Sequence, residues 1–206
     1  MSTFKDLGLH SNYIKSLKEL GIKTPTDIQE QAIPILIKSK TDFVGLAQTG
    51  TGKTAAYGLP VLHKVDANKN AVQGLIIAPT RELVQQIKKQ LFKFTKYNDK
   101  KIFVESVYGG EKIDIQISNL KRRTHIIVAT PGRLVDLLDK NIIDLKHINT
   151  LVLDEADEML SMGFKKDLNT ILDATTKSAR NTWLFSATMP KDLKVIVERY
   201  ISKDAK

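Results

Sequence analysis

Residues 47–54, AQTGTGKT, combine glycine, lysine and threonine in the order that phosphate-binding loops use. Gly50 and Gly52 allow the backbone to approach phosphate oxygens closely. Lys53 can reach the β- and γ-phosphates, and the Thr54 hydroxyl can ligate magnesium. Ala47 stands where the common form of the loop has glycine. The alternative interpretation is a glycine-rich turn with an exposed lysine.

A second set of chemically capable residues lies in TLVLDEADEM (150–159). Asp154 ends an apolar run, and Glu155 follows it directly. Asp154 can hold magnesium through its water shell, while Glu155 can orient and polarise an attacking water. Taken alone, the acidic residues also fit the first turn of a helix, where the helix dipole favours negative charge.

Apolar runs of strand length alternate along the chain with segments of helical period, which predicts a parallel α/β sheet buried on both faces. The phosphate loop then lies between a strand and the start of a helix, where free backbone N–H groups form an anion site. The expected strands are 43–47, 74–78, 101–107, 125–129, 150–154 and 182–186. The expected helices are 11–20, 26–38, 53–64, 81–97, 111–121, 132–139, 156–173 and 190–201.

Composition narrows the class of protein. The 206 residues carry a formal net charge of +9 and contain no cysteine. This positive charge favours a polyanionic partner such as nucleic acid. The absence of cysteine excludes disulfides and thiolate metal sites. We find neither a signal-peptide core nor an apolar run long enough to cross a bilayer, so we expect no membrane partner.

Several motifs occur together in family-like order: DEAD (154–157), AQTGTGKT, SAT (186–188), GIKTPTDIQ (21–29), PTREL (79–83), GG (109–110) and TPGR (130–133). With these motifs the chain resembles the DEAD-box ATP-dependent RNA helicases, from about Phe4 to its end. The resemblance implies a RecA-like three-layer α/β fold, with a mostly parallel twisted sheet and helices on both faces. We expect residues 1–206 to form one such domain, with 1–40 as an amino-terminal Q-motif extension.

The resemblance implies an ATP site with magnesium as cofactor. Gln29 would read adenine, because a side-chain amide both donates and accepts hydrogen bonds; with Thr26 it also matches a helix capping box. Ile22 stands where the family places an aromatic residue against the base. Catalysis would fall to Glu155 and Lys53, and metal binding to Thr54 and Asp154. The expected ATP-binding residues are Ile22, Gln29, Ala47, Gln48, Thr49, Gly50, Thr51, Gly52, Lys53 and Thr54.

The resemblance also implies an RNA surface that contacts the sugar–phosphate backbone without reading bases. Its expected residues are Pro79, Thr80, Arg81, Gly109, Gly110, Thr130, Gly132 and Arg133. Arg133 would add charge or order its loop, and TPGR also fits a helix start with proline in the first turn. Asp157, Ser186 and Thr188 would link the two ligand sites, with Asp157 as a hydrogen-bond partner, although Ser and Thr also favour N-caps. The lysine run at 88–101 fits a solvated helix face better than a docking site.

The family carries a second RecA-like domain that supplies an arginine finger, and nothing here matches its motifs. The chain is therefore either a piece of a longer protein or a short natural one. We expect RNA and a second domain in cis as partners, a monomer, and a cytoplasmic location. Two alternatives stay open: a stand-alone nucleotide- or RNA-binding module without catalysis, and a phosphate-loop ATPase acting on DNA or protein. The four histidines fit no metal spacing, and Met159 and Met162 are expected in the core.

Overall fold

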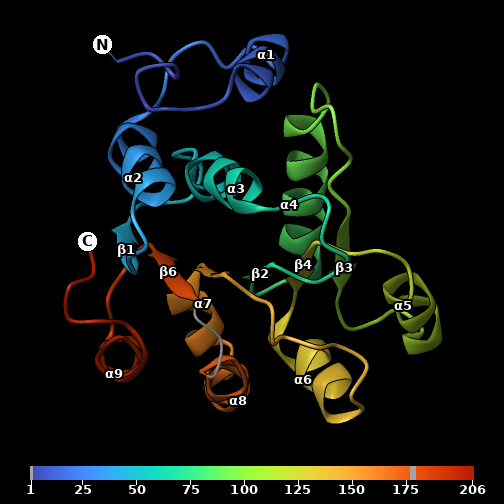
Figure 1. Ribbon diagram of the computed structural model, residues 1–206. Helices are drawn as coiled ribbons and strands as arrows, with labels where there is room; N and C mark the ends of the chain where they lie inside the picture. Colours follow the sequence, from blue (N-terminus) through green and yellow to red (C-terminus); the bar gives the residue numbers. More distant parts are fainter. Residues whose placement is uncertain (1, 177–179) are drawn as a thin grey trace.

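The computed structural model describes residues 2–176 and 180–206. Helices and strands alternate along most of the chain (Figure 1). The strands are β1 (Phe43–Leu46), β2 (Gly74–Ile77), β3 (Val104–Val107), β4 (Ile126–Ala129), β5 (Thr150–Asp154) and β6 (Asn181–Ser186). The helices are α1 (Ser11–Glu19), α2 (Asp27–Lys38), α3 (Lys53–Lys64), α4 (Arg81–Phe94), α5 (Ile113–Leu120), α6 (Pro131–Asp139), α7 (Ala156–Ser161), α8 (Lys165–Thr175) and α9 (Lys191–Tyr200).

The six strands form one sheet in the order β1-β6-β5-β2-β4-β3. Every neighbouring pair is parallel. The central strands β2, β4 and β5 consist of Val, Ile and Leu with few polar residues, and every residue in them is buried. Such runs suit a sheet that has helices on both faces, which is what the structure contains.

Two hydrophobic clusters pack on opposite faces of the sheet, so the molecule has three layers. Helices α1 to α4 cover one face and α5 to α9 the other (Figure 1). Alternate residues of one strand enter different clusters: in β2, Ile76 packs in the first and Leu75 and Ile77 in the second. The predicted RecA-like three-layer arrangement is confirmed, and all described strand pairs are parallel.

Most predicted elements differ from the observed ones by one to three residues at one end or both, and one expected helix is divided. The expected helix at 156–173 is two helices, because Gly163 adopts a left-handed φ of 86° between α7 and α8. The break leaves Met162 exposed while Met159 is buried, so the expectation that both methionines lie in the core was right for Met159 alone. Strand β3 begins at Val104 rather than at residue 101.

All six strands run in the same direction, so the loops that follow them emerge at one edge of the sheet. Each loop that follows a strand carries one of the motifs noted above. The sheet and the helices packed on it thus hold these six loops in a fixed order.

Among the described helices, none is long and apolar enough to cross a membrane.

Candidate nucleotide and nucleic-acid site

The sheet order divides the six motif loops into two groups. Strands β1, β6 and β5 are consecutive in the sheet and lead into AQTGTGKT, SAT and DEAD. Strands β2, β4 and β3 form the other half and lead into PTREL, TPGR and GG. The loops expected to bind ATP thus lie side by side, as do the loops expected to contact RNA. The two groups meet where β5 pairs with β2.

The phosphate loop joins β1 to α3. Gly50 and Gly52 have φ values of 83° and 91°, in the left-handed region that favours glycine. Gly52 is the N-cap residue of α3, and no side chain caps that helix end. The first turn of α3 therefore presents its N–H groups at the loop, where they can bind an anion. Ala47 continues the strand by donating its N–H to the Ser186 carbonyl at 2.9 Å.

Gln29 is held against the phosphate loop. Its Nε2 donates to the Gly52 carbonyl at 3.0 Å, and its Oε1 accepts from the Thr26 N–H at 3.2 Å. Thr26 in turn donates its hydroxyl to the Thr51 carbonyl at 2.8 Å. The bond to Thr26 is one half of the capping box, and Gln29 is only 3% exposed. The Gln29 amide thus connects α2 to the phosphate loop, and these two bonds use one of its two N–H donors and one of its two acceptor lone pairs.

Asp154 is a buried carboxylate at the end of β5, with 2% of its surface exposed. Its Oδ2 accepts a 2.8 Å hydrogen bond from the Tyr57 hydroxyl, and its Oδ1 accepts from the Glu155 N–H at 3.0 Å. Burial raises the pKa of Asp154, while the Tyr57 hydrogen bond and the nearby Lys53 charge oppose that rise. Burial and the Asp154 charge also raise the pKa of Tyr57 far above its ordinary value.

Glu155 adopts a left-handed backbone conformation with φ 52° and ψ 49°. This region is sparsely populated by residues other than glycine, and strain of this kind is often found at functional sites. Burial, followed by the Asp154 charge, raises the pKa of Glu155, and Lys53 opposes the rise. A carboxylate with a raised pKa is better suited to accept a proton near neutral pH.

The Lys53 ammonium is the feature that best tests whether a nucleotide fits. Lys53 is 6% exposed, and its Nζ is buried without a hydrogen-bond partner among the described residues. A buried ammonium without a partner is unfavourable unless a ligand supplies one. Phosphate oxygens at the α3 N-terminus would do so. The oxygen donors of Asp154 and Thr54 are of the hard type that magnesium prefers, so the residues fit magnesium-bound ATP.

SAT and DEAD are joined by a compact hydrogen-bond network. One oxygen of Asp157 accepts from both the Thr188 N–H at 2.8 Å and the Thr188 hydroxyl at 2.7 Å. Ser186 accepts from the Asp157 N–H at 3.2 Å and donates its hydroxyl to the Thr188 carbonyl at 2.8 Å. These hydrogen bonds lower the pKa of Asp157 despite the opposing effect of burial, which is the largest single influence. The expected Asp157 contact is therefore present.

On the other half of the edge, Arg81 is exposed at the start of α4. Its guanidinium lies 5.0 Å from the Tyr108 ring centroid, within cation–π distance. Gly110 lies close by, since a Cβ atom there would come 3.6 Å from Arg81 Nη1. Thr80 uses its hydroxyl as the α4 N-cap, accepting from the Leu83 N–H at 3.2 Å. The structure thus brings the PTREL and GG motifs together.

Arg133 is largely occupied by protein. Its guanidinium donates to the Glu111 carbonyl at 3.1 and 3.2 Å and to Oε1 of Gln116 at 3.0 Å. Gln116 is 1% exposed, and its Nε2 donates to the Tyr108 carbonyl and to the Glu111 carboxylate. Of the two roles considered for Arg133, the structure shows the ordering of a loop. Thr130 precedes Pro131 as the N-cap of α6, as the turn interpretation of TPGR required.

Sequence reasoning missed two residues of this edge. Tyr57 lies one helical turn after Lys53, and that spacing places it on the same helix face. Its contact with Asp154 spans 97 residues, which no local pattern reveals. Gln116 was missed because a glutamine in an exposed-looking helix gives no signal of burial. The lysines at 89, 93, 96, 100 and 101 are exposed.

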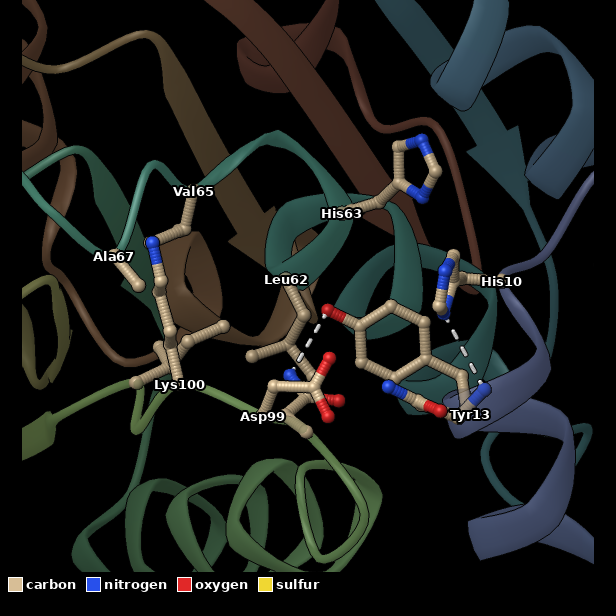
Figure 2. A pocket seen from close by; sticks show the side chains of 11 residues that line it. His10, Tyr13, Leu62, His63, Val65, Ala67, Asp99 and Lys100 are labelled. Carbon is tan, nitrogen blue, oxygen red and sulfur yellow. Dashed lines mark hydrogen bonds between the residues drawn. The ribbon is translucent and has the colours of Figure 1, made fainter.

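Two hollows bear on where ligands could bind. One, of about 550 Å³, lies beside the phosphate loop and is lined by Thr26, Ile28, Leu46, Ala47 and Thr51, among others. The other, of about 320 Å³, lies between α1, the end of α3 and residues 98–102, away from the motif loops (Figure 2). Figure 2 shows the His10 and His63 imidazoles near one another there. Burial, followed by the His10 charge, lowers the pKa of His63.

The described residues hold no cluster of three or more histidine, cysteine or acidic side chains suited to a metal ion.

Comparisons with known proteins agree with this geometry. The family model described as DEAD/DEAH box helicase matches residues 26–196. The chain is 49% identical over 201 residues to "ATP-dependent RNA helicase CshA" of Listeria monocytogenes, and 46% identical over 203 residues to "DEAD-box ATP-dependent RNA helicase CshA" of Bacillus cereus. These matches cover 98% of this chain but only 38% of each relative, so the chain spans well under half of their length.

Solved structures give the same result. A DEAD box protein from the hyperthermophile Methanococcus jannaschii superimposes with a TM-score of 0.93 at 36% identity, over 99% of this chain and 55% of that one. A hypothetical ATP-dependent RNA helicase from Sulfolobus tokodaii superimposes with a TM-score of 0.86 at 35% identity, over 96% of this chain and 56% of that one. With its fold, its motif loops and these matches in agreement, the chain belongs to the DEAD/DEAH box helicase family.

Proposed function

We propose that this chain is the amino-terminal RecA-like domain of an ATP-dependent RNA helicase, which binds magnesium-bound ATP on one half of the sheet edge and the RNA backbone on the other. The observation that carries the proposal is the buried Lys53 ammonium, without a partner, at the start of α3. It lies beside a carboxylate at the end of β5 and another in a strained backbone conformation.

In this proposal the α3 N-terminus and Lys53 bind the phosphates of ATP. Thr54 and Asp154 hold magnesium, which when bound neutralises phosphate charge and polarises the phosphoryl oxygens. Glu155 orients a water for attack on the γ-phosphate and accepts its proton. The Tyr57 hydrogen bond fixes the orientation of the Asp154 carboxylate. Gln29 would read adenine with its second N–H and second lone pair while it stays bonded to Gly52, so base recognition would be coupled to the shape of the phosphate loop.

RNA is proposed to lie across the loops after β2, β4 and β3. Arg81 and the backbone near Gly110 and Gly132 would contact phosphates, and such contacts carry no base information. Thr130 offers a hydroxyl beside them. Arg133 would act by holding the 109–116 loop in place rather than by touching RNA. The Asp157–Thr188 network lies in the nucleotide half and would transmit the state of one ligand to the other.

We propose that a second RecA-like domain is needed for turnover. No arginine lies in the loops that follow β1, β5 and β6, so this chain offers the γ-phosphate no arginine finger from its nucleotide half. Such a group contributes about 10³–10⁵ in rate, or about 4–7 kcal/mol. Unwinding also requires two domains that close when both ligands are bound.

The test is ATP turnover by residues 1–206 alone and by the same chain fused to a second domain of this family, each with and without RNA. We expect RNA-stimulated turnover from the fusion only, and Glu155→Gln in the fusion should abolish it while ATP still binds. RNA-stimulated hydrolysis by the chain alone would refute the need for a second domain. A fusion that binds both ligands without turnover would favour a binding module over an enzyme.

A further inference from the structure

A groove of about 750 Å³ lies far from the motif loops, between the end of α1, the end of α4 and the start of β3. Helix α4 begins at Arg81 near the RNA loops and runs back across the sheet to this groove. Its axial length from Arg81 to Phe92 is about 16 Å at 1.5 Å per residue. A partner bound in the groove would therefore not compete with RNA at Arg81.

The groove has an apolar floor and exposed aromatic side chains. Leu20, Ile102 and Val104 line it, and Phe92 and Phe103 are 75% and 39% exposed. Phe92 points away from the α4 face that packs on the sheet, which is formed by Val84, Ile87, Leu91 and Phe94. Large apolar side chains gathered around one hollow mark interaction sites more often than single exposed ones do.

The rim of the groove is basic. Three lysines line it, Lys93, Lys96 and Lys101, against one carboxylate, Glu19. Lys96 is paired with Glu19, which also accepts a hydrogen bond from Tyr97. Among the described residues, neither Lys93 nor Lys101 has an acidic partner within ion-pair distance. The unbalanced charge favours an acidic partner.

The groove reaches the first residue of β3, Val104, which belongs to the edge strand of the sheet. Strand β3 is last in the sheet order, and within residues 2–176 and 180–206 no strand pairs with its outer side. The carbonyls of Phe103 and Val107 accept from residues on the β4 side. In a parallel ladder the backbone groups of the alternate residues, Val104 and Ser106, then face outward. An unpaired strand edge is a template for an added extended segment.

We propose that this groove binds an extended acidic peptide segment of a partner protein. The peptide would pair with β3 as an added strand, place large apolar side chains against Phe92 and Phe103, and place carboxylates at Lys93 and Lys101. A single-stranded nucleic acid would use the lysines and stack bases on Phe92 and Phe103, but it would not use the aliphatic floor or the backbone donors and acceptors of the strand edge. An acidic peptide with apolar side chains uses all three features.

The probe is a fluorescent twelve-residue peptide of Asp and Glu with Phe, Ile and Leu, arranged so that each face of the extended chain carries both acidic and apolar side chains. The matched probe replaces its acids by lysine, and twelve-nucleotide oligouridylate serves as the RNA probe. Binding to residues 1–206 is measured by anisotropy and mapped by amide chemical shifts of the labelled chain. We expect the acidic peptide alone to shift the amides of Val104, Ser106 and residues near Phe92.

Phe92→Ser, and separately Lys93→Glu with Lys101→Glu, should weaken the acidic peptide at least tenfold. Two controls keep the same chemistry elsewhere: Val195→Ser alters an exposed apolar residue of α9, and Lys146→Glu an exposed lysine before β5. Equal binding of the lysine peptide, shifts that map to another surface, or oligouridylate binding in the groove would each overturn the proposal. Concentration-dependent shifts at the groove without peptide would assign it to a second copy of the chain instead.

Discussion

The Tyr57 hydroxyl donates a 2.8 Å hydrogen bond to Oδ2 of Asp154, which links the helix after the phosphate loop to the strand end that carries the DEAD motif. Tyr57 is fully buried, and so is nearly all of Asp154. The bond therefore lies in a low-dielectric environment where an unsatisfied group is costly. It binds the two halves of the proposed ATP site to one another.

Tyr57→Phe should destabilise the fold by about 1.5–3 kcal/mol, the range for a hydrogen bond to a charged group. The measurement is urea unfolding at neutral pH. The matched control is Tyr200→Phe, whose hydroxyl donates to Asp173 at 2.8 Å on an exposed surface, and its loss should be well under 1 kcal/mol. If both substitutions lowered the free energy of unfolding equally, burial would not strengthen the contribution of the Tyr57 hydrogen bond to stability.

Asp154→Asn should remove one pH dependence from the stability of the free protein, and it should remove ATP hydrolysis from the two-domain fusion. Burial raises the pKa of Asp154, so its ionisation costs the folded state stability as the pH rises from the unfolded pKa to the folded pKa. Asparagine does not ionise, so the variant should gain stability relative to the parent across that interval and keep a constant difference above it. Its absolute stability also reflects the two hydrogen bonds that the carboxylate oxygens accept, because an amide has only one acceptor oxygen. Thermal unfolding of both proteins from pH 4 to pH 8 tests the sign, and a variant that loses stability relative to the parent as the pH rises would contradict it.

Thr188→Val should uncouple the two ligands of the fusion protein. It removes the 2.7 Å hydroxyl bond to Asp157 but keeps the 2.8 Å backbone bond and the side-chain volume. We expect ATP affinity to change less than twofold while RNA stimulation of turnover falls at least tenfold. The control is Thr176→Val, whose hydroxyl bonds the Asp173 carbonyl on an exposed helix end. Unchanged stimulation would refute a linking role.

Adenine nucleotides should bind in preference to guanine nucleotides, and calorimetric titration with ADP and GDP measures this. Because the Gln29 amide is bound to Gly52 and Thr26, Gln29→Ala should reduce stability as well as base selectivity. Ile22→Phe should tighten ADP by up to about 1 kcal/mol, on the scale of aromatic stacking. Equal affinities for ADP and GDP would show that Gln29 does not recognise the base. If Ile22→Phe left the ADP affinity unchanged, residue 22 would not contact the adenine ring.

Arg81→Ala should change the salt dependence of RNA binding, whereas Arg133→Ala should change the stability of the fold. For single-stranded RNA the salt slope is about −0.7 per phosphate neutralised, so two or three contacts give about −1.4 to −2.1. Arg81→Ala should flatten the slope by about 0.7 and leave stability unchanged, since Arg81 is exposed. Arg133→Ala should lower the unfolding free energy because Glu111 and Gln116 lose their donor. A loss of stability in Arg81→Ala alone would reverse these assignments.

Much of this fold was predictable from local pattern. Runs such as LVLD and LIIA are continuous and apolar because both faces of their strands are buried, and helix α3 begins at the predicted residue because Gly52 ends the loop there. The helix break at Gly163 was missed because one glycine within a helical period also fits an unbroken helix. The motif loops were predictable one at a time, but their spatial order was not.

Contacts between distant segments escaped prediction for a different reason. Gln29 could be assigned either to a cap or to a base, and nothing in its neighbourhood in the sequence shows that Gly52 lies within reach. Tyr57 and Gln116 resemble ordinary helix residues until the sheet order brings Asp154 and Tyr108 beside them. Such contacts depend on which strands pair in the sheet, and a single sequence does not show that pairing.

The pairing of β5 with β2 has a consequence for how two ligands are sensed. Leu151, Val152 and Leu153 align with Leu75, Ile76 and Ile77, and all six are fully buried. Interiors packed this closely deform little. Neither ligand can therefore shift its own strands relative to those of the other. A second domain that docks on this edge would therefore meet both ligands in one fixed arrangement and would respond to their joint presence without any movement of the strands. The Asp157–Thr188 contact would then couple the ligands between loops rather than through the sheet.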